Sequence, residues 1–154
     1  MTQPQTTRLV FFRSKSRIYA RMLRWMTGGN VSHVGFLMSD NDTVASQRET
    51  FELESLSIDL KGRKHFILDL PKGVIVKESD LRFLAEIDDN QLINYGWLDY
   101  VWFLPRKLFG GKIVNWPGYI CSEIVWAIMF TGGWDVVLEV PSPHSLMQAV
   151  MNHG

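Results

Sequence analysis

Short runs of apolar residues separated by polar or glycine-containing turns dominate the first half of the chain. Such runs are typical of strands, because alternate side chains of a strand face opposite sides of a sheet. They predict strands over residues 9–12, 31–38, 43–49 and 65–70, with a looser alternation over residues 51–60. Residues 39–42 have the composition of a hairpin turn, so the second and third of these strands should pair.

In the second half the apolar residues recur mainly at helical spacing. Helices are predicted from Glu78 or Ser79 onward, over residues 92–104, from Cys121 to Thr131 and after Pro143, with a further helix between Ser16 and Gly28. In the helix that begins at Cys121, apolar residues follow three, four and seven positions later. The sulfur therefore shares the stripe that faces the core.

Strands followed by helices in one chain of 154 residues indicate a single α+β domain spanning residues 1–154. Sixteen basic and sixteen acidic residues balance, so no overall field would attract nucleic acid. One cysteine excludes an internal disulfide, and the four histidines do not reproduce a zinc-ligand spacing. We therefore expect no metal and no cofactor.

The polar N-terminus lacks the basic and apolar regions of a secretory signal, which favours synthesis in a cytoplasm. The longest apolar run, residues 124–130, is far shorter than the roughly 20 residues that span a bilayer. It predicts a core helix and no transmembrane segment.

Cys121 and His33 are the candidates for chemistry. Unpaired N–H groups and the helix dipole at the start of the Cys121 helix favour a thiolate, the nucleophilic form of cysteine. His33, on a predicted strand, supplies the base that such a nucleophile needs. Each residue alone is more often a buried structural residue, and it is their combination that predicts a catalytic dyad.

A third polar group would fix the orientation of the imidazole. If the turn centres on Asp40 and Asn41, Gly35 pairs with Ser46, which then shares a face with His33. Adding one residue to the turn would bring Gln47 or Glu49 to that face instead. Ser46 ranks first and Glu49 second, with Gln47 as the other alternative.

Several short motifs occur in an order that resembles the permuted NlpC/P60-like branch of the papain-like cysteine hydrolases, especially its small phage and bacterial members. They are Ser32-His33-Val34-Gly35, then Ser46, the strand over residues 66–71 that ends in Leu-Pro, Tyr95-Gly96-Trp97-Leu98, and last Cys121-Ser122-Glu123. The resemblance covers residues 9–150. Two departures are Ser46, where the family often has a stronger partner such as glutamate, and Gly96, where it commonly has aspartate.

The resemblance implies a circularly permuted papain-like fold, with an antiparallel sheet packed against helices, and hydrolysis of an amide bond through a thioacyl intermediate. Cys121 would be the nucleophile, His33 the base and Ser46 the orienting residue. Backbone N–H groups at Cys121 and Ser122 would stabilise the oxyanion, and Tyr95 and Trp97 would contact the substrate. The substrate would be a peptide, most simply cell-wall peptidoglycan.

Two other functions stay open. Related permuted domains are similar to acyltransferases, and the tryptophan-rich segment around Trp97 could accept an acyl chain, so the protein could act on a lipid or thioester. Alternatively, the neutral partner Ser46 fits a phage structural or host-interaction protein that kept the fold without strong catalysis, in a virion or in the host cytoplasm.

Overall fold

The computed structural model describes residues 4–13, 18, 21, 29, 31–48, 50–88, 121–138 and 142–153. Within them an antiparallel sheet of five strands has the order β5-β4-β3-β2-β6. The strands are β2 (Arg8–Arg13), β3 (Val31–Leu37), β4 (Thr43–Gln47), β5 (Phe51–Ser55) and β6 (His65–Asp69). The predicted strands and the hairpin pairing of β3 with β4 are thereby confirmed.

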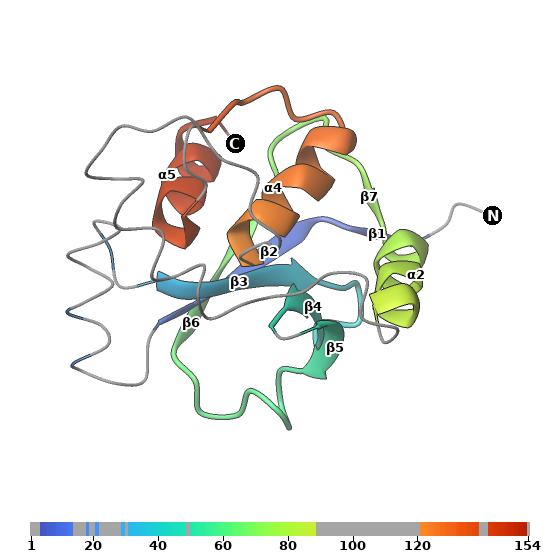
Figure 1. Ribbon diagram of the computed structural model, residues 1–154, viewed down its shortest axis with the longest axis vertical. Coiled ribbons are helices and arrows are strands. Elements are labelled where there is room, and N and C mark those ends of the chain that lie inside the picture. Colours follow the sequence, from blue (N-terminus) through green and yellow to red (C-terminus); the bar gives the residue numbers. More distant parts are fainter. Residues whose placement is uncertain are drawn as a thin grey trace.

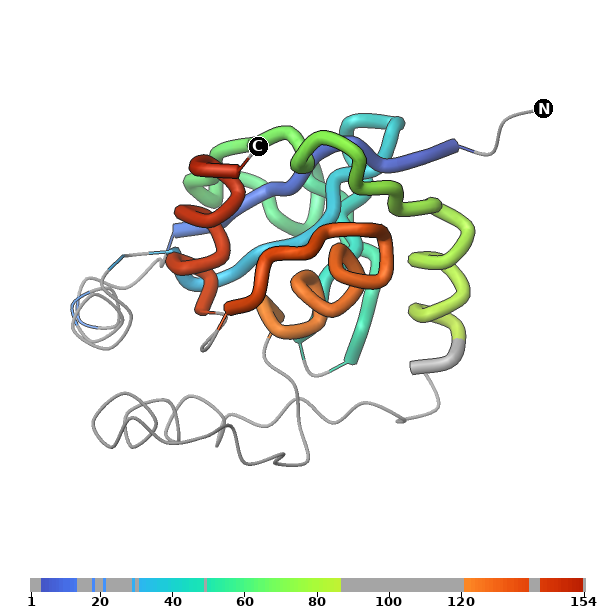
Figure 2. Tube along the Cα trace, turned by 90° about the horizontal axis from the view of Figure 1, so that it is seen from above, coloured from blue at the N-terminus to red at the C-terminus, as the bar shows by residue number. Residues whose placement is uncertain are grey.

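Three helices are described, and all three were predicted: α2 (Glu78–Asp88), α4 (Cys121–Thr131) and α5 (Pro143–His153). Helices α4 and α5 pack on the same side of the sheet, whereas α2 lies at the opposite end of the molecule from α5, beside β4 and β5 (Figures 1 and 2). The described residues therefore form an α+β structure with antiparallel strand pairing. The predicted helix over residues 92–104 lies outside the described residues.

A second sheet of two strands, β1 (Gln5–Thr6) with β7 (Val76–Lys77), was not predicted from the sequence. Strands of two residues leave no periodic pattern, so only their tertiary pairing reveals them.

The sequence indicated no clear end to the strand that begins at Phe51. It stops at Ser55, because the Asp59 carboxylate accepts a hydrogen bond from the Ser55 N–H and starts a turn.

The sheet separates two apolar clusters. The main cluster joins one face of the sheet to all three described helices and contains Phe11, Val34, Leu81, Cys121 and Leu146. The smaller cluster, on the other face, is made by Val10, Phe12, Leu37, Val44 and Leu60. Alternate residues of β2 and β3 thus belong to different clusters, and this alternation decides on which side of the sheet each candidate site residue lies.

Candidate active site

Cys121 is the first residue of α4 and is fully buried in the main cluster. The backbone N–H groups of Val34, on β3, and of Ser122 donate hydrogen bonds to its sulfur. The start of α4 is therefore seated against the middle of the strand that carries His33. The predicted dyad requires the His33 and Cys121 side chains to lie side by side. The structure brings together the two segments that carry them, but directs the two side chains toward different clusters.

Burial raises the pKa of the Cys121 thiol to about 11, although the N–H groups of Val34 and Ser122 and the charge of Arg63 act in the opposite direction. The expectation of a thiolate at the helix N-terminus is therefore wrong for this arrangement. Removing the sulfur from water disfavours its anion by more than the helix terminus favours it. At neutral pH Cys121 carries its proton.

His33 is nearly buried in the centre of the sheet, where its ring lies against Phe12 with 5.8 Å between centroids. Burial, followed by the charges of Arg63 and Arg48, lowers the pKa of His33 to about 3. The imidazole is thus neutral at physiological pH. Its Nε2 atom is buried and has no hydrogen-bond partner among the described residues.

The register of the sheet sets the relation between the two side chains. His33 pairs with Phe12 of the smaller cluster, whereas Val34 pairs with Phe11 of the main cluster, which includes Cys121. The imidazole therefore leaves β3 toward Phe12, while the sulfur contacts the backbone of the next residue from the side of α4. Among the described contacts, no hydrogen bond joins the thiol to the imidazole.

Ser46 lies where the parity argument placed it. The β3–β4 ladder pairs Phe36 with Ala45, and continuing it sets Ser46 opposite Gly35 on the His33 face. A Cβ added to Gly35 would stand 2.9 Å from the Ser46 Cβ, which supports this register and explains why only glycine fits there. The Ser46 hydroxyl is buried and has no described partner.

Of the two alternatives to Ser46, Gln47 pairs with Phe51 of the main cluster and so lies on the Cys121 face. Both polar atoms of its buried amide lack a described partner, as does the hydroxyl of Ser122 at the start of α4. Glu49 lies outside the described residues, as do Tyr95 and Trp97, the predicted substrate contacts.

Buried polar atoms without described partners thus lie on both sides of the sheet, those of His33 and Ser46 on one face and those of Gln47 and Ser122 on the Cys121 side. Such atoms are few in most proteins, because each lost hydrogen bond costs about 1–3 kcal/mol. On each side of the sheet these atoms are available to hydrogen-bond a ligand or reactant.

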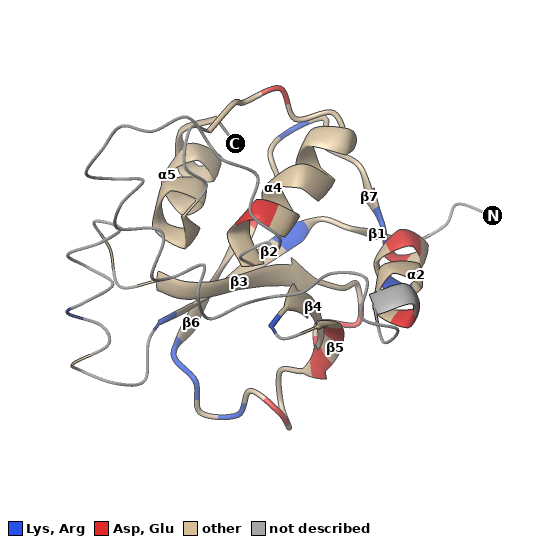
Figure 3. Ribbon diagram, viewed as in Figure 1, with Lys and Arg blue, Asp and Glu red and all other residues tan. Residues whose placement is uncertain are grey.

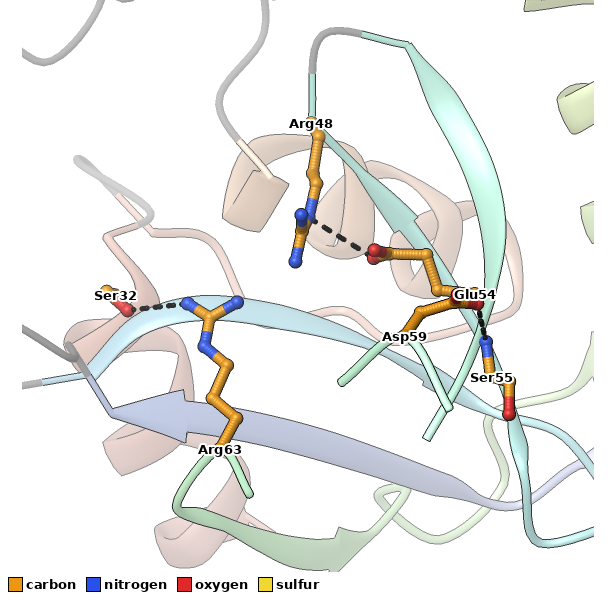
Figure 4. A network of polar contacts seen from close by, with 6 residues as sticks. All are labelled: Ser32, Arg48, Glu54, Ser55, Asp59 and Arg63. Carbon is orange, nitrogen blue, oxygen red and sulfur yellow. Dashed lines mark hydrogen bonds and ion pairs between the residues drawn. The ribbon is translucent and has the colours of Figure 1, made fainter. Parts of the chain in front are cut away.

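Arg63 lies next to the candidate site, although the sequence did not identify it as a site residue. Its guanidinium lies 5.0 Å from the centroid of the Phe12 ring and donates to the Ser32 hydroxyl at 3.2 Å (Figure 4). No pattern in the sequence singled out Arg63. Its approach to β3 depends on the pairing of β6 with β2, which no local pattern encodes.

No protein-family model matches the chain, and no curated protein shows significant similarity to it. None of the described helices combines the length and apolar character needed to cross a bilayer. In the same described part of the chain, no three or more His, Cys, Asp or Glu side chains gather into a group that could hold a metal ion.

Proposed function

We propose that the protein is a cysteine hydrolase of the permuted papain-like type that cleaves an amide bond, with cell-wall peptide as its substrate. The supporting observation is the seating of the Cys121 sulfur among N–H groups of α4 and β3, directly beside the residue that bears the imidazole. Nearby, His33, Ser46 and Ser122 have buried polar atoms without described partners.

In the proposed reaction His33 takes the thiol proton as the Cys121 sulfur attacks the carbonyl carbon. The N–H groups that now face the sulfur are suited to stabilise the oxyanion, which is worth about 3–4 kcal/mol for a single donor in known hydrolases. Collapse of this intermediate breaks the C–N bond, and the proton held by His33 passes to the leaving amine. Water then hydrolyses the thioacyl group, while Ser46 orients the imidazole by accepting its N–H.

This reaction has to start from a neutral thiol and a neutral imidazole that approach β3 from different sides. Substrate binding would therefore have to bring the two groups together and stabilise the ion pair.

The test is digestion of purified peptidoglycan, followed by mass analysis of the fragments. The wild type should release peptide fragments, and Cys121→Ala should release none while keeping the thermal unfolding midpoint within a few degrees. Lys72→Ala, at an exposed turn, is the matched control and should digest at the wild-type rate. Full activity of Cys121→Ala would refute the mechanism, and labelling of Cys121 only by lipid-like acyl probes would replace the peptide substrate by an acyl one.

The protonated, buried thiol favours a second candidate, a binding or structural protein that uses the same fold without catalysis. In that case iodoacetamide should modify Cys121 slowly at pH 6–8 and faster toward pH 11, in step with the thiolate fraction. A thiol that acts as a nucleophile in the presence of substrate should instead become reactive at neutral pH when substrate is added. These two patterns of iodoacetamide modification distinguish a binding protein from a cysteine hydrolase.

A further inference from the structure

The outer edge of β6 is open to a further strand. In the five-stranded sheet β6 is the last strand, and among the described residues it pairs only with β2. Its central side chain, Ile67, is 40% exposed. A strand edge with an exposed apolar centre is a template for pairing with another chain.

The ladder between β2 and β6 shows which backbone groups face the open edge. At one end the Leu70 N–H donates to the Thr7 carbonyl at 2.7 Å. At the other end the Arg13 N–H donates to the Lys64 carbonyl at 2.9 Å. In an antiparallel ladder the groups of alternate residues point to the same edge, so the even-numbered residues face β2. The N–H and carbonyl groups of the odd-numbered residues of β6 point outward: His65, Ile67 and Asp69.

The side chains of β6 divide between the two faces of the sheet with the same alternation. His65 and Ile67 pair with residues of the smaller cluster, so Asp69, two positions further on, lies on that face too. Phe66 and Leu68, on the opposite face, pack against the main cluster. One face of β6 thus presents an imidazole, an apolar centre and a carboxylate in that order, and the other face presents two apolar side chains.

The order of these side chains is self-complementary. When a second copy of β6 pairs antiparallel about Ile67, the two Ile67 side chains meet, and His65 of each copy lies opposite Asp69 of the other. On the other face Phe66 lies opposite Leu68 of the second copy. All outward backbone groups of β6 then find partners, since odd-numbered residues meet odd-numbered residues. A shift of two residues would set Ile67 against His65 or Asp69, so the centred register is favoured.

The other edge of the sheet carries a less suitable pattern. β5 has two glutamates, Glu52 and Glu54, and acidic residues appear red on β5 in Figure 3. Pairing β5 with a second β5 about Leu53 would set Glu52 opposite Glu54 of the second copy. Like charges directly opposite each other destabilise a strand pair. The charge pattern therefore favours the β6 edge over the β5 edge as a contact between copies.

We propose that the protein forms a symmetric dimer through β6, in which two copies of the five-stranded sheet join edge to edge into one continuous sheet. Two-fold symmetry requires a patch that is complementary to itself, as β6 is. Five residues from each copy make a small interface, so the dissociation constant should be roughly 10–100 µM. This dimer does not depend on the hydrolysis proposed above, because β6 carries none of the candidate catalytic residues.

Sedimentation velocity of the whole protein, over a roughly hundredfold range of concentration that brackets this constant, tests the proposal. A monomer should convert to a dimer as the concentration rises. Sedimentation as a monomer throughout would overturn the proposal. Growth beyond the dimer would overturn it too, because a two-fold interface closes on itself.

Charge reversal tests the register. His65→Asp sets an aspartate opposite Asp69 of the other copy, and Asp69→Lys sets a lysine opposite His65. Each change should raise the dissociation constant about tenfold or more, and the double variant should return it to within about threefold of the wild type. Both positions are exposed, so circular dichroism should show folded variants. A double variant that dimerises no better than the single variants would refute the pairing.

Ile67→Lys tests the centre of the interface. It brings two lysines together at the symmetry axis and should raise the dissociation constant by more than about tenfold. Phe83→Lys is the matched control, an exposed apolar residue on α2, which packs beside β5 at the other edge of the sheet. It should dimerise as the wild type does. An equal loss in Phe83→Lys would show non-specific apolar association and so contradict the proposal.

Amide hydrogen exchange tests the backbone pairing itself. The N–H groups of Phe66 and Leu68 face β2 and should be protected at every concentration. The N–H of Ile67 faces the open edge and should exchange quickly in the monomer and more slowly as the dimer forms. A dimer in which the Ile67 N–H still exchanges quickly would place the interface on another surface and refute the assignment to β6.

Discussion

At the scale of single residues, the candidate site shows how burial can outweigh local electrostatics. A helix terminus stabilises a nearby charge by roughly 0.3–2 kcal/mol, whereas complete burial can shift a pKa by several units, each worth about 1.4 kcal/mol. Desolvation is accordingly the largest influence on both Cys121 and His33. Each is held in its neutral form.

The neutral state of His33 makes the folded protein sensitive to acid. In the unfolded chain His33 binds a proton near pH 6.5, but in the folded protein only near pH 3. Below pH 6.5 the unfolded state therefore binds more protons than the folded state. The stability that neutral His33 contributes is lost as the pH falls from about 6.5 toward about 3. We expect a loss of about 2 kcal/mol between pH 7 and pH 5.

Urea unfolding at the two pH values measures this loss. His33→Gln cannot titrate, so the difference between its stabilities at pH 7 and pH 5 should be much smaller than that of the wild type. His153→Gln, at the exposed end of α5, should leave the wild-type difference intact. An identical loss in wild type and His33→Gln would show that burial of His33 does not govern the acid response.

The variant Ser46→Ala distinguishes a role of the Ser46 hydroxyl in activity from a role in stability. Its buried hydroxyl has no described partner, so Ser46→Ala should leave the free energy of unfolding unchanged or slightly higher. If Ser46 orients His33, the same change should lower kcat by about tenfold to a hundredfold.

Ser55→Ala is the matched comparison for Ser46→Ala. Its hydroxyl donates to the Asp42 carboxylate at 2.6 Å, away from the site. Removing it should lower stability by about 1–2 kcal/mol and leave the rate of hydrolysis unchanged. A stability loss without a rate loss in Ser46→Ala would exclude the orienting role.

At the scale of elements, a single side chain joins α2 to the β3–β4 hairpin. The carboxylate of Glu78, the first residue of α2, accepts a hydrogen bond from the Ser39 N–H at 2.6 Å, and Glu78 is only 5% exposed. Its own N–H donates to the Pro4 carbonyl. The start of α2 is therefore connected both to the hairpin and to the N-terminal segment.

Glu78→Ala should consequently lower the free energy of unfolding by about 1.5–3 kcal/mol, the usual value for a hydrogen bond to a charged group. Asp80→Ala removes a carboxylate from the same helix turn but at an exposed position. It should lower stability by no more than about 1 kcal/mol, through the helix dipole. Chemical denaturation of the two variants makes the comparison, and equal losses would contradict the connecting role of Glu78.

At the scale of the whole molecule, one apolar cluster joins the sheet to all three described helices. Leu146 of α5 and Val34 of β3 belong to the same cluster, although more than a hundred residues separate them. Because both elements lose their core contacts together, the sheet and helices should unfold in one transition, as the prediction of a single domain requires.

Leu146→Ala tests that cooperativity. Leu146 is fully buried, so the change should lower the free energy of unfolding by about 2–5 kcal/mol and shift the transitions seen by circular dichroism and tryptophan fluorescence together. Met151→Ala, on the exposed side of the same helix, should shift neither by more than about 0.5 kcal/mol. Two separate transitions in Leu146→Ala would show that α5 unfolds independently of the sheet.

The sequence by itself determined the local elements and ranked first the hairpin register that the structure shows. Period-two runs predicted β2, β3, β4 and β6, the helical spacing predicted α2, α4 and α5, and the turn at Asp40 and Asn41 set Ser46 on the His33 face. These features depend on neighbours within a few residues, so their signals are contained in short stretches of sequence.

Only the tertiary structure decided which of those elements contact one another and how these contacts affect the candidate site residues. It seated Cys121 against Val34 and buried it, which reversed the expected direction of the thiol pKa shift, and it brought Arg63 to Phe12 beside His33. The short pair of β1 and β7 likewise exists only through long-range pairing. Burial and the proximity of charges depend on contacts between segments that are distant in the sequence. No local pattern of residues specifies these contacts.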